Sequence, residues 1–97
     1  MMDQFSRSRL LLGQAGVDKL LSSHVMILGL GGVGGYAAEA LARSGVGRMT
    51  LVDHDQVTLT NLNRQIIATH DTLGQKKVDA MAERLRSIRP DLKLTLA

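Results

Sequence analysis

Hydrophobic positions change their spacing several times along the chain, and each change predicts a new element. Residues 6–22 place leucines and valines at roughly helical intervals, interrupted by two glycines, which predicts two short helices. The apolar run 24–28 ends at glycines and predicts a buried strand. Residues 33–44 follow a helical pattern, with Gly45 as a C-terminal cap. The face expected to pack inward is Val33, Ala37, Ala40, Leu41 and Ser44.

The second half of the chain repeats this alternation. Residues 49–52 read as a strand that Asp53 closes, and residues 55–70 read as a loop followed by a short helix. The clearest amphipathic helix follows and ends before Pro90, and Thr72 with Gln75 resembles a capping box at its start. Its apolar face is Val78, Met81, Leu85 and Ile88. Residues 92–96 alternate and predict a third strand.

Strands that alternate with helices predict an α/β fold with a Rossmann-like parallel sheet and right-handed crossovers. We expect N-terminal helices in residues 1–22 and a βαβ-αβ unit in residues 23–97. Three strands make about half of a doubly wound sheet. The chain is therefore expected to form the N-terminal half of a larger nucleotide-binding domain.

Composition narrows the class of protein. The 97 residues are 44% hydrophobic and 22% charged, which is a globular composition. The absence of cysteine excludes disulfides, thiolate zinc sites and cysteine nucleophiles. No apolar run is long enough for a membrane span, and the polar N-terminus does not read as a signal peptide, so we expect a cytoplasmic protein. The net charge of +3 suits a polyanionic partner, but one Phe and one Tyr cannot build a stacking platform for single strands.

A glycine loop follows the first predicted strand. Gly29, Gly31 and Gly34 match the pattern G-x-G-x-x-G, and the helix after them presents free N–H groups to an anion. Asp53 ends the next strand 19 residues after Gly34, where an acid accepts hydrogen bonds from a ribose. This context predicts nucleotide binding. The alternatives are a glycine turn that serves packing alone and an Asp53 that is merely solvated.

Polar and cationic residues after the second strand favour ATP over NAD. Asn61, Arg64 and Gln65 are spaced so that a local helix directs them to one place, where they suit a triphosphate. Lys77 lies in the first helical turn, where the helix dipole disfavours a cation unless an anion compensates. Two alternatives remain: Lys77 is a solvated surface residue, and Arg64 forms an ion pair with Asp55. An NAD-dependent oxidoreductase domain also remains an alternative.

Metal binding and histidine catalysis have weaker support. Asp53 and Asp55 are two apart in an extended segment and point to opposite sides, so they do not form a metal clamp as a pair. One of them can reach a nucleotide-bound Mg²⁺ through water. The three histidines are scattered and read as structural.

Three segments together resemble a known family. They are GLGGVGGYAAEALARSGVG, LVDHDQVTLTNLNRQI and LGQKKVDAMAERLRSIRPDLKL. They look like the nucleotide-binding half of the ThiF/MoeB/HesA superfamily, relatives of the ubiquitin-activating enzymes. The resemblance covers nearly the whole chain and implies binding of ATP with Mg²⁺ and adenylation of a carboxylate.

The resemblance also implies roles for individual residues. The phosphate and adenosine pocket is expected at Gly29, Gly31, Gly32 and Gly34, the ribose at Asp53, and the triphosphate at Asn61, Arg64 and Lys77, with Asp55 and Gln65 beside them. An arginine near the N-terminus is expected to enter the partner subunit's site. Arg7 is the better match and Arg9 the second choice, which implies a homodimer with composite sites.

Two branches of the superfamily compete. The sulfur-carrier adenylyltransferases usually read N-L-Q-R-Q, whereas residues 61–65 here read N-L-N-R-Q. This segment, FSRSRLLLG and MAERLRSIRPD are more similar to the branch that cyclises threonylcarbamoyladenosine in tRNA. That resemblance implies tRNA as the substrate and a ubiquitin-like sulfur-carrier protein as the alternative. An aspartate that holds Mg²⁺ and the substrate-facing half are expected beyond residue 97.

Overall fold

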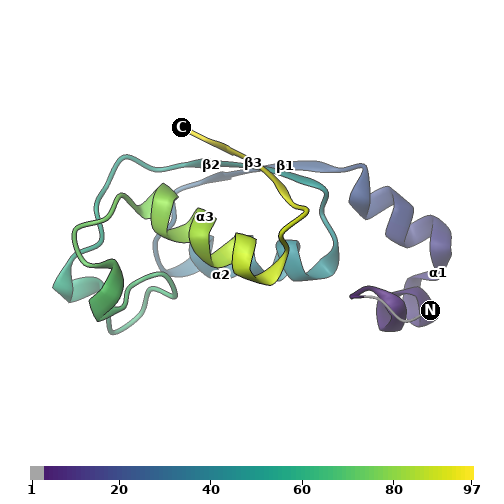
Figure 1. The fold of residues 1–97 in the computed structure, drawn as a ribbon, viewed down its shortest axis with the longest axis horizontal. Helices are drawn as coiled ribbons and strands as arrows, with labels where there is room; N and C mark the ends of the chain where they lie inside the picture. Colours follow the sequence, from purple (N-terminus) through teal and green to yellow (C-terminus); the bar gives the residue numbers. More distant parts are fainter. Residues whose placement is uncertain (1–3) are drawn as a thin grey trace.

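Three parallel strands form the sheet of this chain, whose computed structural model describes residues 4–97. Residues 1–3, which the sequence analysis assigns to the N-terminal helical region, lie outside the described residues. The strands are β1 (His24–Leu28), β2 (Arg48–Val52) and β3 (Lys93–Leu96), and they pair in that order. The helices are α1 (Ser6–Leu21), α2 (Gly32–Ser44) and α3 (Lys77–Ile88), with 3₁₀ turns η1 (Leu59–Asn61) and η2 (His70–Thr72) between β2 and α3. Figure 1 shows this arrangement, which confirms the Rossmann-like α/β prediction.

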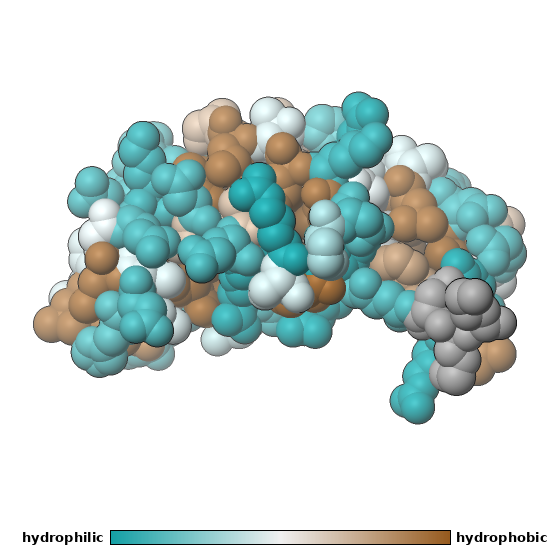
Figure 2. Space-filling model, viewed as in Figure 1, coloured by the Kyte–Doolittle hydropathy of each residue, from teal (hydrophilic) through white to brown (hydrophobic). Residues whose placement is uncertain are grey.

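Helices α2 and α3 lie on the same side of the sheet (Figure 1). Ile27, Met49 and Leu51 project from the strands toward these helices and form the centre of the core. Met26 and Leu28 alternate with them on β1 and are 59% and 74% exposed. The expectation of a buried first strand is therefore wrong for one face, which no element of residues 4–97 covers. Figure 2 shows hydrophobic side chains along the upper side of the molecule, where Figure 1 places the sheet.

Small residues set the inner face of α2. Gly35, Ala38 and Ala42 are buried and Leu41 packs against the core as predicted, whereas the predicted inner positions Val33, Ala40 and Ser44 are exposed. At Gly35 a Cβ would lie 3.1 Å from Ile66 Cγ2, which is closer than an ordinary contact. The helix packs so closely against its neighbours that only small side chains fit on its inner face. Gly45 ends α2 in the left-handed region, as predicted.

Helix α3 packs through the predicted face. Val78, Met81 and Leu85 are buried, and Ile88 is half-buried. The helix ends two residues before Pro90, as expected. The predicted capping box at its start is wrong, because Lys76 is the N-cap residue and has no side-chain cap bond. Thr72 belongs to η2 instead, where its hydroxyl donates to the Ile67 carbonyl (2.7 Å).

The N-terminal region forms one helical element with a break. Gly13 has φ 73° and ψ 167°, which separates two helical pieces as the sequence predicted, while Gly16 lies inside the second piece. Phe5, just before α1, is buried, and the Arg89 guanidinium carbon lies 4.9 Å from the centre of its ring. This contact attaches the start of α1 to the end of α3.

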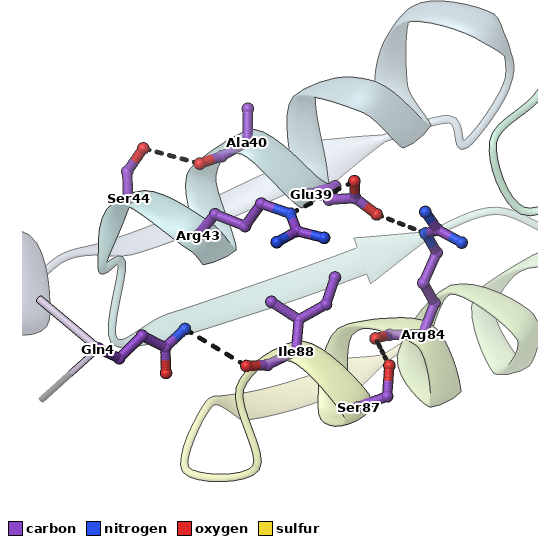
Figure 3. Close-up of polar contacts among 8 residues, drawn as sticks. All are labelled: Gln4, Glu39, Ala40, Arg43, Ser44, Arg84, Ser87 and Ile88. Carbon is purple, nitrogen blue, oxygen red and sulfur yellow. Dashed lines mark hydrogen bonds and ion pairs between the residues drawn. The ribbon is translucent and has the colours of Figure 1, made fainter.

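Polar contacts also join α2 to α3 (Figure 3). Glu39 accepts a hydrogen bond from Arg84 and pairs with Arg43 at 3.4 Å. The hydrogen bond from Arg84 is the largest effect on the pKa of Glu39 and, with the charges of Arg84 and Arg43, holds that pKa below its ordinary value of 4.5 despite burial. None of the helices within residues 4–97 is long and apolar enough to span a bilayer.

Candidate functional site

The glycine loop connects β1 to α2 at the carboxyl edge of the sheet. Gly29 has φ 89°, and its N–H donates to the Val52 carbonyl (2.8 Å), so the chain turns sharply at the end of β1. A Cβ on Gly34 would lie 1.8 Å from the Gly29 carbonyl oxygen, so only glycine fits there. Gly31 precedes α2 and gives no side-chain cap, which leaves N–H groups of the first turn available to an anion.

Asp53 joins the end of β2 to the glycine loop. Its Oδ2 accepts a hydrogen bond from the Leu30 N–H, and its Oδ1 accepts one from the Asp55 N–H, both at 2.8 Å. Partial burial raises the pKa of this carboxyl, but the two N–H donors and the positive charge of Lys77 outweigh it and hold the pKa below the ordinary 3.8. Asp53 is therefore ionised at neutral pH, and each oxygen keeps a lone pair for a further donor.

Lys77 is the buried cation of the site. It begins α3 with only 7% of its surface exposed, and its N–H donates to the Asp55 carbonyl (2.9 Å). Its ammonium has no hydrogen-bond or ion-pair partner within residues 4–97. It lines an open cleft of about 400 Å³ together with His54, Asp55, Gln56, Thr58 and Asn61. A cation whose stem is buried and whose ammonium lacks a hydrogen-bond or ion-pair partner within residues 4–97 can stabilise an anion in this polar cleft.

Asn61 and Gln65 are buried polar residues of the segment that follows β2. Both are 7% exposed. The Asn61 Oδ1 accepts from the Thr58 N–H (2.9 Å), so this side chain caps η1. Gln65 Nε2 lies 3.9 Å from the position that a Cβ on Gly31 would take, and Gln65 Oε1 is buried without a partner among the described residues. An orphaned acceptor beside the loop suits a ligand donor.

Arg64 lies on the surface of the same segment. Its Nη1 donates to the Thr60 carbonyl (3.0 Å) and to Asn63 Oδ1 (3.1 Å), and it forms no ion pair with Asp55. Its backbone carbonyl lies 4.0 Å from where a Cβ on Gly32 would be, so the residue is next to the loop. The expected local helix stops at η1 and continues as turns, so Arg64, Asn61 and Gln65 are neighbours but do not share one helical face.

The candidate N-terminal arginines lie at the other end of the sheet. Arg7 and Arg9 are on α1, which leads into the start of β1, whereas the glycine loop follows the end of β1. Figure 1 shows α1 at one end of the molecule and residues 55–76, in teal and green, at the other. Arg7 is exposed and has no polar partner within the described range, while Arg9 Nε donates to Gln14 Oε1 (2.7 Å). Neither arginine reaches the glycine loop of its own chain.

The described part of the chain contains no group of three carboxylate or imidazole side chains placed to bind a metal ion. His24 hydrogen-bonds Thr50 Oγ1 (2.7 Å) across the sheet, which is a structural contact. His54 lines the cleft beside Lys77. The sequence did not assign His54 to the site, and its place directly after Asp53 was the available signal.

The chain as a whole matches a known family. The model of the ThiF family matches residues 5–97. The chain belongs to the ThiF family. The tRNA threonylcarbamoyladenosine dehydratase of Bacillus subtilis (strain 168) is 55% identical over 91 residues, which is 94% of this chain and 36% of that protein.

Two other ThiF-type relatives are also similar. The sulfur carrier protein ThiS adenylyltransferase of Escherichia coli (strain K12) is 44% identical over 94 residues, covering 95% of this chain and 38% of that protein. The crystal structure of the E. coli tRNA N6-threonylcarbamoyladenosine dehydratase in complex with ATP superposes with a TM-score of 0.94 at 44% identity, covering 97% of this chain and 39% of that one. The chain thus spans little more than a third of the length of the relatives it matches, and its fold is that of the matched part.

Proposed function

We propose that the complete protein containing this chain binds ATP with Mg²⁺ and uses it to adenylate a carboxylate. The observation that carries this proposal is the position of Lys77, a largely buried residue that lines the cleft and whose positive charge lowers the pKa of Asp53. Asp53 in turn holds the glycine loop through Leu30. One small region therefore offers a phosphate loop, a ribose acceptor and a cation for a triphosphate.

The site residues fit the nucleotide in the roles that the family resemblance implies. The loop glycines leave room for a phosphate, Asp53 accepts from the ribose, and Gln65 Oε1 offers an unused acceptor. Asn61 and Lys77 line the triphosphate cleft, and Asp55 beside them can reach Mg²⁺ through water. Arg64 is next to the loop, and its guanidinium must turn from Thr60 to contact phosphate.

The reaction needs positioning and charge stabilisation. A carboxylate oxygen forms a bond to the α-phosphorus while the bond to the pyrophosphate oxygen breaks. Lys77 and Arg64 offset negative charge on the phosphate and on the departing pyrophosphate, and Arg7 from a second subunit adds to them. No general base is required, since a carboxylate is ionised at neutral pH.

The proposed carboxylate is that of threonylcarbamoyladenosine in tRNA. After adenylation, an amide nitrogen of the same modified residue displaces AMP, loses its proton and closes a hydantoin ring, with net loss of one water. The dehydratases from Bacillus subtilis and E. coli support this substrate, at 55% and 44% identity. The second candidate is the C-terminal glycine of a ubiquitin-like sulfur-carrier protein, which the likeness to the ThiS adenylyltransferase supports.

Pyrophosphate exchange and nucleoside mass spectrometry test the two parts of this proposal. We expect the complete gene product to exchange pyrophosphate into ATP and to convert the tRNA nucleoside to a product lighter by one water. Lys77→Ala should lower the exchange rate about 100-fold. Lys19→Ala is the control, because it removes the same charge from an exposed position on α1, away from the cleft, and should stay within about twofold.

Each failure has a separate meaning. Equal rates for the Lys77 and Lys19 variants would overturn the assignment of the cleft. Binding of NAD but not ATP in isothermal titration would replace adenylation by hydride transfer. Exchange that depends on a sulfur-carrier protein, with the tRNA nucleoside unchanged, would select the second candidate.

A further inference from the structure

Basic side chains line up across the sheet at the edge away from the glycine loop. His24 pairs with Arg48 in the parallel register, and Arg48 pairs with Lys93. Register partners on neighbouring strands have side chains on the same face and lie about 4.8 Å apart. All three residues are exposed and line one hollow of about 410 Å³, with Leu21, Ser22 and Gly47. We call these three residues the basic row.

No acid neutralises the basic row within the described part of the chain. The ion pairs there involve Glu39 or Asp91, and neither acid contacts Arg48 or Lys93. The residues that line the hollow include no Asp or Glu. Like charges directly opposite each other on neighbouring strands destabilise a sheet. A bound anion removes that cost, so the arrangement favours an anionic ligand.

The basic row is too far from the nucleotide site to share its ligand. Strand β1 runs from His24 to Leu28, which precedes the glycine loop, and its four steps rise about 13 Å. Figure 1 shows α1 beside the amino ends of the strands and the cleft-forming segment at the opposite end. The phosphates of a nucleotide held by Asp53 and Lys77 therefore remain outside the row. An anion at the row is a second ligand or a distant part of a large substrate.

A structured RNA is the anion that fits best. Proteins hold RNA helices largely through phosphate and ribose contacts, and basic side chains spaced along an edge suit repeated phosphates. Tyr36 and Phe5 are the only aromatic residues, and Phe5 is buried, so the row offers no stacking platform for a single strand. His24 Nε2 is held by Thr50 Oγ1, so the ring keeps a fixed place beside the two cations.

We propose that the basic row of His24, Arg48 and Lys93 contacts the phosphate backbone of a structured RNA. The identity of that RNA as the substrate tRNA rests on the proposed function. The tRNA then spans the sheet, with the modified nucleoside at the nucleotide edge and the backbone of another part at the amino edge. The row fixes orientation and affinity and reads no sequence.

The test measures tRNA binding by the complete gene product. Arg48→Ala combined with Lys93→Ala should weaken binding at least fivefold for all tRNA sequences and reduce the salt slope by about 1 to 2. The matched control is Arg86→Ala, because Arg86 is an exposed arginine on α3 outside the row. The control variant should bind tRNA within twofold of wild type. Thermal unfolding and ATP titration of each variant report whether the fold and the nucleotide site are intact.

The outcomes separate this inference from the proposed function. If wild type converts the tRNA nucleoside and the double variant binds tRNA equally well, the basic row is not a contact surface. The same conclusion follows if Arg86→Ala costs as much as the double change, or if polyglutamate competes as well as RNA. If wild type exchanges pyrophosphate but neither binds nor converts tRNA, the proposal that tRNA is the substrate is wrong. The proposal that the basic row contacts RNA is then wrong as well.

Discussion

The Asp53 carboxylate accepts a hydrogen bond from the Leu30 N–H at 2.8 Å, which fixes the glycine loop to the end of the neighbouring strand. The acid that was expected to contact the ribose therefore also shapes the loop. We predict that Asp53→Asn weakens ATP binding at least tenfold and lowers the free energy of unfolding by about 1–3 kcal/mol, because two hydrogen bonds to a charged acceptor are lost or weakened. Isothermal titration and urea denaturation measure both effects. Asp71→Asn, at an exposed acid in η2, serves as the control and should change neither.

Substitutions at two glycines of the loop should affect stability and ATP binding differently. A Cβ at Gly34 would lie 1.8 Å from the Gly29 oxygen, so Gly34→Ala should cost about 3 kcal/mol or more of stability. At Gly31 a Cβ meets nothing closer than 3.9 Å and φ is −71°, so Gly31→Ala should cost less than about 1 kcal/mol. The methyl group nevertheless occupies space beside the phosphate. We expect a folded Gly31→Ala protein with ATP affinity reduced at least tenfold, and normal affinity would contradict the placement of the phosphate.

Glu39 should make stability depend on acid pH. The pKa of Glu39 in the folded chain lies below the ordinary 4.5 because of Arg84 and Arg43, so the unfolded chain takes up the proton first. The stabilisation is complete above pH 4.5 and is lost as pH falls through the lower folded value. Since both arginines are more than a third exposed, solvent screening limits the effect to about 0.5–1 kcal/mol. Glu39→Gln should flatten this part of a stability–pH curve measured by denaturation, and an unchanged curve would contradict the assignment.

Arg7 is expected to act in a neighbouring subunit, because α1 and the glycine loop lie at opposite ends of the sheet. Arg7→Ala and Lys77→Ala should each lower pyrophosphate exchange in the complete gene product, about 100-fold for Lys77→Ala. Mixing the two variants after unfolding and refolding should restore roughly a quarter of the wild-type rate, since subunits that pair at random place both intact residues in one site of each mixed dimer. Arg9→Ala mixed with Lys77→Ala tests the second choice. No recovery in either mixture would exclude a composite site.

The order of elements followed from the sequence because local physics dominates there. The period of the apolar positions, the glycines and Pro90 specify the strands and the ends of α2 and α3 without reference to distant residues. The buried stripe of α3 was also predictable, since Val78, Met81 and Leu85 recur at helical spacing. The loop and Asp53 were found for the same reason, because their spacing is set by one βαβ unit.

Other features depended on which surfaces meet in three dimensions. The inner face of α2 was only partly predicted, because close packing on Ile66 favours Gly35 over a larger apolar residue. Arginine is usually exposed in proteins. Arg89 is nevertheless 1% exposed, and its Nη1 donates to the carbonyls of Ala42 and Val46.

Sequence alone determined the elements and the residue types of a nucleotide loop, because those rest on contacts between near neighbours. Tertiary structure decided that Lys77 is buried, that Gln65 faces the loop, and that the basic row spans three strands. Burial and register are properties of segments distant in sequence, and only their packing brings them together.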